Sequence, residues 1–309
     1  MASAAVLIPI LGGPTASGKS AVALKLAAEL GLEIVAADAM QVYRGMDIGT
    51  AKPTPAEREQ VPHHLIDVVT PAEPFSVADY VRRAEEALAA VLARGRLPLV
   101  VGGTGFYIRA LAEGLPTAPP ADPEAQAPLW KDYEKNGLGR MVAELERLSP
   151  QDAARAQRNP RRVIRALEVL RRTGRPPSAF PRTTPAFRYD KAVLLPPMDT
   201  LRPRIVQRTR RMFEAGLVSE VRALLEAYPD PLTALQAIGY KEVATHLAGR
   251  STLEEAEVAV TIATLQYARR QRTWFRKEPE ARHIPGLAEP VLGELRMWLR
   301  QRSQALAEG

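Results

Sequence analysis

The sequence predicts an α/β fold in which a parallel sheet of the P-loop type is flanked by helices and carries a helical insertion domain. Three observations support this prediction. Residues 13–20, GPTASGKS, match the phosphate-loop pattern G-x-x-x-x-G-K-[ST]. An apolar run at 5–11 precedes this loop as a strand, and 20–30 follows it with helical spacing. A proline-rich stretch at 114–128 then separates this core from a mainly helical segment.

The first part of the core is expected over residues 1–121, where strand and helix signals alternate as in a parallel sheet with right-handed crossovers. Pro9 lies inside the first strand and has no amide hydrogen, so we expect either a bulge there or a first half outside the sheet. The signals are, in order, 5–11 (strand), 20–30 (helix, ending at Gly31), 32–37 (strand), 76–94 (helix) and 97–101 (strand).

The proline-rich boundary introduces an insertion domain that we expect over residues 122–184. This segment is helical by pattern and includes a run at 159–173. The strand-like KAVLLPP at 191–197 then predicts a return to the sheet. Residues 185–309 would form the second part of the core, which long helices dominate.

Composition limits the classes to which this chain can belong. The 309 residues are 46% hydrophobic, which supports a sizeable core. The chain contains no cysteine, which excludes disulfides and thiolate metal sites and suits a reducing compartment. No apolar stretch approaches the length of a membrane span, and the start lacks a basic leader. We therefore expect a cytoplasmic protein, a monomer without membrane contact.

The phosphate loop is expected to bind a diphosphate or a nucleotide such as ATP. Backbone N–H groups at the start of the following helix can cradle phosphate oxygens, and Lys19 adds a positive charge. The Ser20 hydroxyl is the expected ligand for Mg²⁺. The predicted binding residues are Gly13, Pro14, Thr15, Ala16, Ser17, Gly18, Lys19 and Ser20.

A strand-end carboxylate that nucleotide hydrolases use for magnesium is missing from the strand at 97–101, which runs into Gly102–Gly105. The guanine-binding pattern N-K-x-D is also absent. Asp38 instead ends the strand at 32–37, and ligands of parallel sheets bind beyond the carboxyl ends of strands. We expect the phosphate loop, Asp38 and Thr104 to share one pocket. A turn or N-cap aspartate is the alternative interpretation of Asp38.

The net charge of +7 is concentrated in three clusters. Residues 155–175 hold eight arginines and one acid, Glu168, and residues 202–211 hold five arginines and no acid. The stretch 261–277 has five basic residues, no acid and interleaved aromatic residues. Basic side chains with aromatics favour an RNA surface, where cations meet phosphates and rings stack on bases. Solvated helix faces with core aromatics are the alternative.

Several longer strings extend these motifs along the chain. They are, in order, ADAMQVYRGMDIGTAKP, VGGTGFYI, RRVIRALEV, AIGYKE and RRQRTWFRK. Together they resemble the tRNA dimethylallyltransferase family over about residues 8–277. The resemblance implies transfer of a dimethylallyl group from dimethylallyl diphosphate to the exocyclic amine of the adenine 3′-adjacent to the anticodon in tRNA. The phosphate loop would then bind the diphosphate of the donor, and Mg²⁺ would be the cofactor.

The resemblance also implies roles for individual residues. Asp38 would be the general base, Thr104 a hydroxyl contact near the reacting groups and Arg208 a partner for the diphosphate. The family usually has serine after this aspartate, where this chain has Ala39. Residues expected to contact tRNA are Asp38, Ala39, Met40, Gln41, Thr104, Arg161, Arg162, Arg165, Gly239, Tyr240, Lys241, Arg269, Arg270, Arg272, Trp274 and Arg276.

Two other functions share parts of this pattern. A small-molecule or nucleotide kinase would use the phosphate loop, a strand-end Asp38 and a helical lid, but it would leave the arginine clusters without a role. A non-enzymatic RNA-binding switch driven by nucleotide would use the basic surfaces, but it would not need Asp38 and Thr104 facing the loop.

Overall fold

The computed structural model describes residues 6–229, 232–286 and 289–307. The chain divides into two compact units, a core formed by 1–112 with 186–309 and an inserted unit formed by 113–185. The insertion expected from the sequence spans 122–184. Residue 5, the start of the first predicted strand, lies outside the described residues.

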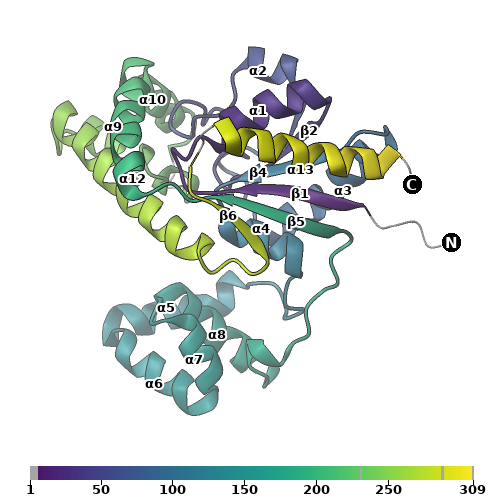
Figure 1. The fold of residues 1–309 in the computed structure, drawn as a ribbon. Coiled ribbons are helices and arrows are strands. Elements are labelled where there is room, and N and C mark those ends of the chain that lie inside the picture. Colours follow the sequence, from purple (N-terminus) through teal and green to yellow (C-terminus); the bar gives the residue numbers. More distant parts are fainter. Residues whose placement is uncertain (1–5, 230–231, 287–288, 308–309) are drawn as a thin grey trace. The chain divides into compact units, whose positions relative to one another are not determined.

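The core unit is built on a six-stranded sheet in the order β3-β2-β4-β1-β5-β6, in which every pairing is parallel (Figure 1). The predicted α/β class is confirmed. The two short edge strands, β3 and β6, were not expected from the sequence. The strands are β1 (Leu7–Gly12), β2 (Glu33–Ala37), β3 (His63–His64), β4 (Pro98–Gly102), β5 (Arg188–Leu194) and β6 (Ala281–Ile284).

Helices lie between consecutive strands along the chain, and α13 (Glu289–Ala307) follows the last strand. α1 begins directly after the phosphate loop and ends at Gly31, whose left-handed φ of 66° suits a residue without a side chain. The other helices that begin in this unit are α2 (Pro55–Gln60), α3 (Val77–Ala93), α4 (Gly105–Glu113), α9 (Met198–Glu214), α10 (Leu217–Ala227), α11 (Tyr240–Leu247), α12 (Leu253–Phe275) and α13 (Glu289–Ala307), and α1 spans Lys19–Leu30.

Alternate residues of each strand enter two separate cores. Leu11 joins the cluster that includes Leu26 of α1, and α13 covers the same face of the sheet (Figure 1). Ile10 joins the opposite cluster with Leu88 of α3 and Ile108 of α4. Because the strands are parallel and covered on both faces, their carboxyl ends all meet at one edge. The loops after β1, β2 and β4 therefore lie close together.

Two strands differ from the expectation. β1 pairs with β5 along its whole length, through Pro9, but it pairs with β4 only from Ile10 onward. The first half of β1 is therefore neither bulged nor outside the sheet. The amide hydrogen that Pro9 lacks is tolerated, because β4 does not pair with β1 at Pro9. β5 spans Arg188–Leu194 instead of 191–197. Prolines at the end of the predicted run cannot donate to a ladder, and they precede α9 instead.

The inserted unit is a small helical bundle. Its helices enclose a cluster that includes Leu129, Leu145 and Leu167. Asn159 caps the last of these helices by accepting from the Arg162 amide, as the N-cap preference predicts. The helices are α5 (Pro123–Asn136), α6 (Leu138–Leu148), α7 (Pro150–Ala156) and α8 (Pro160–Thr173).

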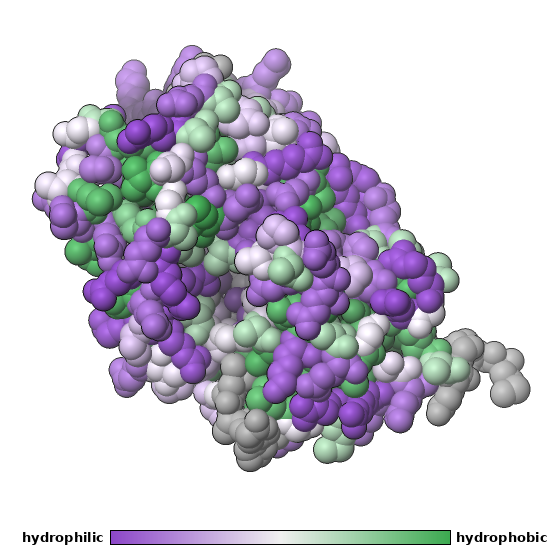
Figure 2. All heavy atoms as spheres, turned by 90° about the horizontal axis from the view of Figure 1, so that it is seen from above, coloured by the Kyte–Doolittle hydropathy of each residue, from purple (hydrophilic) through white to green (hydrophobic). Residues whose placement is uncertain are grey.

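Hydrophilic side chains cover much of the face seen in Figure 2, with apolar side chains between them. Within the described residues, no helix combines the length and the apolar character needed to cross a membrane.

Candidate active site

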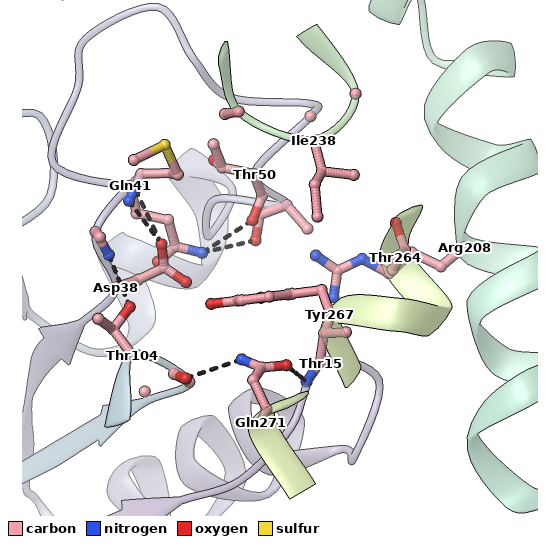
Figure 3. A pocket seen from close by; sticks show the side chains of 18 of the residues that line it. Thr15, Asp38, Gln41, Thr50, Thr104, Arg208, Ile238, Thr264, Tyr267 and Gln271 are labelled. Carbon is pink, nitrogen blue, oxygen red and sulfur yellow. Dashed lines mark hydrogen bonds between the residues drawn. The ribbon is translucent and has the colours of Figure 1, made fainter. Parts of the chain in front are cut away.

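A cavity of about 330 Å³ lies in the core unit, where the loops after β1, β2 and β4 meet α9 and α12. Most of the side chains in Figure 3 come from these segments, which are far apart in the sequence. The expected convergence of the phosphate loop, Asp38 and Thr104 is therefore present in the structure. The residues expected from the sequence that line this cavity are Thr15, Lys19, Ser20, Asp38, Ala39, Met40, Gln41, Thr104, Arg208, Gly239 and Tyr240.

The phosphate loop has the backbone geometry that its glycines allow. Gly18 has a φ of 90° at the start of α1, where any other residue would be strained. A Cβ on Gly13 would lie 2.7 Å from the carbonyl oxygen of Leu194. The Ser17 hydroxyl is buried and has no hydrogen-bond partner among the described residues.

Lys19 carries an unusually acidic ammonium group. Its Nζ donates to the Pro14 carbonyl oxygen at 3.2 Å. Burial lowers the pKa of Lys19 to about 8, and the nearby positive charge of Arg208 acts in the same direction, while the Asp38 carboxylate opposes both. A bound anion would restore the charged form, so this lysine is suited to hold a phosphate group.

Asp38 both lines the cavity and closes a turn of the backbone. Its Oδ1 accepts hydrogen bonds from the backbone amides of Met40, at 2.9 Å, and Gln41, at 3.3 Å, as in an Asx turn. Among the described residues, these two bonds are the ones that reach its carboxylate, and both end on Oδ1. Oδ2 is therefore left to accept a hydrogen bond from a ligand in the cavity.

Two hydrogen bonds join Thr104, after β4, to the backbone on either side of Asp38. Its Oγ1 accepts from the Ala39 amide at 3.0 Å, and its own amide donates to the Ala37 carbonyl oxygen at 3.1 Å. A Cβ on Gly102 would lie 2.0 Å from that same carbonyl oxygen, so β4 must end in glycine for the loops to approach this closely.

Arg208 enters the cavity from α9, opposite Asp38 (Figure 3). Burial lowers the pKa of Arg208, while the negative charge of Asp38 raises it. Lys19 and Arg208 therefore place two cations beside the phosphate loop.

The segment after Asp38 is held by hydrogen bonds of Gln41 and by ion pairs of a nearly buried lysine, Lys52. Gln41 donates to the carbonyl oxygens of Thr50 and Ala51, both at 3.2 Å. The Lys52 ammonium is nearly buried and contacts Asp47 at 2.5 Å and Asp67 at 2.6 Å. This network fixes residues 38–52 as one wall of the cavity.

Comparison with known proteins agrees with this geometry. A family model described as IPP transferase matches residues 41–278, which is more than half of the chain. The chain belongs to the IPP transferase family. A model described as isopentenyl transferase also matches residues 6–70, which include the phosphate loop.

Curated relatives of this IPP transferase are similar over nearly their whole length. The tRNA dimethylallyltransferase of Thermus thermophilus is 57% identical over 294 residues, which cover 95% of this chain and 97% of the relative. That of Deinococcus radiodurans is 51% identical over 280 residues, which cover 89% and 91%. The resemblance noted in the sequence is confirmed.

Solved structures show the same fold. The tRNA isopentenylpyrophosphate transferase of Bacillus halodurans is 35% identical, with a TM-score of 0.72 and 98% coverage of both chains. A eukaryotic dimethylallyltransferase described as acting on tRNA is 27% identical, with a TM-score of 0.70, and the match covers 87% of this chain and 69% of that one.

Three further residues of this family member contribute to the site. Tyr267 was expected only as an aromatic residue of the basic stretch 261–277, and Gln271 and Glu220 were not expected from the sequence. Tyr267 points its ring into the cavity from α12 (Figure 3), and burial raises the pKa of its hydroxyl to about 12, with Asp38 adding to the effect. Gln271 lies one turn further along α12. Glu220 of α10 accepts from the amides of 47–49. Tyr267 and Gln271 lie within the basic stretch 261–277, and this position is the signal that could have suggested a role for them.

Tyr240, which was expected to contact tRNA, lines the cavity, but its side chain is engaged inside the protein. Its side chain is fully buried, and its hydroxyl donates to Glu220 Oε1 at 2.6 Å. Glu220 in turn holds the amides of 47–49, and Gly49 lies so close to the Tyr240 ring that a Cβ there would overlap it. We therefore assign the Tyr240 side chain to positioning this loop. Gly239 lines the cavity, and Lys241 is exposed next to Glu242.

The residues expected to contact tRNA at the end of α12 and directly after it divide into exposed and packed groups. Arg269, Arg270 and Arg276 are exposed. Arg272 is partly buried and donates to the Pro196 carbonyl oxygen. Trp274 packs against the core, with the Arg109 guanidinium 4.2 Å above its ring, so it matches the core-aromatic alternative.

The arginines of the inserted unit divide in the same way. Arg161 and Arg162 are exposed on α8. Arg165 instead pairs at 2.8 Å with the buried carboxylate of Glu168, which Arg172 also contacts. Burial raises the pKa of Glu168, but these arginines and hydrogen bonds from the Asp122 amide and the Gln126 side chain lower it below its ordinary value. Arg165 therefore already has a structural partner.

The residues around the phosphate loop fit a magnesium ion that is held mainly by its substrate. In the described part of the chain, no group of three or more histidine, aspartate or glutamate residues is placed to bind a metal. The Ser20 side chain is exposed at the cavity beside Lys19. Mg²⁺ commonly keeps several waters and takes few protein ligands beside substrate phosphates, so one hydroxyl is a suitable donor.

Proposed function

We propose that this protein transfers a dimethylallyl group from dimethylallyl diphosphate to the exocyclic amine of the adenine 3′-adjacent to the anticodon in tRNA, and releases diphosphate. One observation carries the proposal. Two cations and a carboxylate, Lys19, Arg208 and Asp38, line one cavity at the phosphate loop. The names of the curated relatives supply the donor and acceptor classes.

The phosphate-loop side of the cavity is suited to the leaving group. When the bond between C1 of the donor and the diphosphate oxygen breaks, its electron pair stays on that oxygen. Negative charge then grows beside Lys19, Arg208 and the loop amides, and fixed cations and N–H donors are what stabilise it. Mg²⁺ bound at Ser20 would neutralise part of the same charge.

Asp38 is suited to the acceptor side. The adenine amine is a weak acid until its nitrogen begins to bond to C1 of the donor, and it then loses a proton. Asp38 Oδ2 accepts this proton, while its Oδ1 stays bonded to the amides of Met40 and Gln41. Thr104 holds the neighbouring Ala39 amide, which keeps the carboxylate in place.

The adenine must leave its stack to enter this cavity, and extrusion is easiest in a single-stranded loop. The exposed arginines Arg269 and Arg270 lie on α12, which also lines the cavity, and Arg276 directly follows this helix; all three would contact the tRNA backbone. Arg161 and Arg162 of the inserted unit would contact the same tRNA. Because RNA phosphates are the partners, this binding depends on salt.

The test is transfer of radiolabelled dimethylallyl from its diphosphate to tRNA with magnesium and without any nucleotide. We expect label in tRNA and release of one diphosphate per transfer. A kinase would instead need ATP and would phosphorylate a small acceptor. A strict ATP requirement, or ATP hydrolysis in proportion to transfer, would refute the proposal.

A further inference from the structure

Gln271 joins two loops of the cavity through both ends of its side-chain amide. Its Oε1 accepts from the Thr15 amide of the phosphate loop at 2.9 Å. Its Nε2 donates to the Gly103 carbonyl oxygen at 2.8 Å, directly before Thr104 (Figure 3). The side chain is 6% exposed, so water does not replace these bonds easily. Gln271 therefore fixes the separation between the phosphate loop and the loop that carries Thr104.

A primary amide suits both partners at once at any pH, because it always has one donor group and one acceptor. A glutamate would present a second acceptor to the Gly103 carbonyl oxygen, and a methionine of similar length would offer neither bond. The contact also explains the glycine at 103, because a Cβ there would lie 2.6 Å from Nε2. The two loops are thus shaped to receive this one side chain.

The helix that carries Gln271 also carries the basic residues proposed to bind tRNA. Arg269 and Arg270 are exposed on α12 and Arg276 directly follows the helix, all within five residues of Gln271. One turn before Gln271, Tyr267 extends from the same helix into the cavity. A shift of α12 when RNA docks on these arginines would therefore move the link between the two loops.

We propose that Gln271 is a positioning residue that couples tRNA docking on α12 to binding of the donor diphosphate. The inference rests on the proposed function for the identity of the two ligands. By thermodynamic reciprocity, tRNA should raise the affinity of the phosphate loop for diphosphate, and diphosphate should raise the affinity for tRNA by the same factor.

The experiment measures this factor directly with the full chain. Inorganic diphosphate with magnesium is the probe, and its dissociation constant is determined with and without saturating tRNA. We expect tRNA to tighten diphosphate binding in the wild type by about 5- to 100-fold, the usual range of coupling. In Gln271→Met we expect a ratio near one, with tRNA affinity changed by less than about threefold because the exposed arginines remain.

Gln266→Met is the matched control, because Gln266 is an exposed glutamine on the same helix. It should keep the wild-type ratio. If Gln271→Met keeps the ratio as well, or if the wild type shows no coupling, the proposal is wrong. An equal loss of diphosphate affinity, tRNA affinity and thermal stability in Gln271→Met would show that Gln271 has only a structural role. That outcome would also contradict the proposal.

Gln271→Glu provides a second variant in case Gln271→Met does not fold. A protonated glutamic acid can accept from the Thr15 amide and donate to the Gly103 carbonyl oxygen, but a carboxylate can only accept. Position 271 is buried, and burial raises the pKa of a carboxyl group, so relative to wild type at each pH the coupling ratio should recover as pH falls from about 8 to 5. A ratio independent of pH would refute the role of these two bonds. All of these measurements need no turnover, so absence of prenyl transfer would refute the proposed function separately.

Discussion

The Thr104 hydroxyl accepts a hydrogen bond from the Ala39 backbone amide at 3.0 Å, and this bond joins the loop after β2 to the loop after β4. The resemblance to the family implies serine at this position, where this chain has Ala39. Its methyl group offers no hydrogen bond, but its amide still holds Thr104 next to Asp38. The backbone at this position is therefore fixed without a hydroxyl on residue 39.

Two replacements of Thr104 distinguish the effect of its hydrogen bond with the Ala39 amide from the effect of its size. Thr104→Val keeps the shape but leaves the Ala39 amide without its acceptor, which typically costs about 1–3 kcal/mol. We expect transfer in a single turnover to slow by about 10- to 100-fold, because small misplacements of a reacting group have effects of this size. Thr104→Ser keeps the acceptor and should stay within a few-fold of wild type. Equal rates for the two variants would show that the bond has no role.

Asp38→Asn tests the proton acceptor. An amide has nearly the size of the carboxylate but cannot take the proton, so we expect the transfer rate to fall by about a hundred- to ten-thousand-fold. Asparagine can still accept from the Met40 and Gln41 amides, so folding and tRNA affinity should change little. Single-turnover transfer at saturating substrates is the measurement. A rate near that of the wild type would exclude Asp38 as the base.

Lys19 should make donor use sensitive to mild alkali. Its pKa is lowered to about 8 by burial and by Arg208, so the ammonium is charged below this pH and neutral above it. We expect kcat/KM for dimethylallyl diphosphate to fall as pH rises through about 8, since kcat/KM reports groups of the free enzyme. Arginine stays protonated, so Lys19→Arg should remove this step from the profile. A step that persists in Lys19→Arg would assign it to another group.

Arg161 and Arg165 form a matched pair on α8, one exposed and one bonded to Glu168. The affinity for tRNA should fall less steeply with salt in Arg161→Ala. The negative slope of log affinity against log salt should become shallower by about 0.7–0.9, the value for one lost phosphate contact. The variant should leave thermal unfolding unchanged. Arg165→Ala removes a partner of a buried carboxylate, so we expect it to destabilise the protein by about 1–3 kcal/mol. If Arg161→Ala leaves the slope unchanged, the exposed arginines of α8 are only a solvated face.

Tyr240→Phe tests the assignment of Tyr240 to the interior. The variant removes the hydrogen bond to Glu220, a bond to a charged group worth about 1.5–3 kcal/mol, and leaves the ring in place. We expect lower stability in urea unfolding and an unchanged salt dependence of tRNA binding. Unchanged stability together with weaker, salt-shifted tRNA binding would restore Tyr240 as an RNA contact.

Much of the site could be located from contiguous sequence. The phosphate loop is eight consecutive residues whose glycines and lysine act through local backbone geometry. Asp38 and Thr104 were located because parallel strands place their carboxyl ends at one edge, so the end of each strand marks the site. The α/β class followed from the same alternation of strand and helix patterns, which depends on residues close in sequence.

The sequence by itself determined the phosphate loop, the strand-end Asp38 and the presence of basic stretches, because each is a local pattern of residue types. Only the tertiary structure decided which members of those patterns have partners. Gln271 meets Thr15 across 256 residues of sequence, and Arg272 donates to the Pro196 carbonyl oxygen across 76 residues while Arg269, on the same helix, is exposed. The physical reason is that helical and strand periodicity arises between neighbours along the chain. The hydrogen bonds of a buried side chain depend instead on which distant segments the packed core brings within about 3 Å.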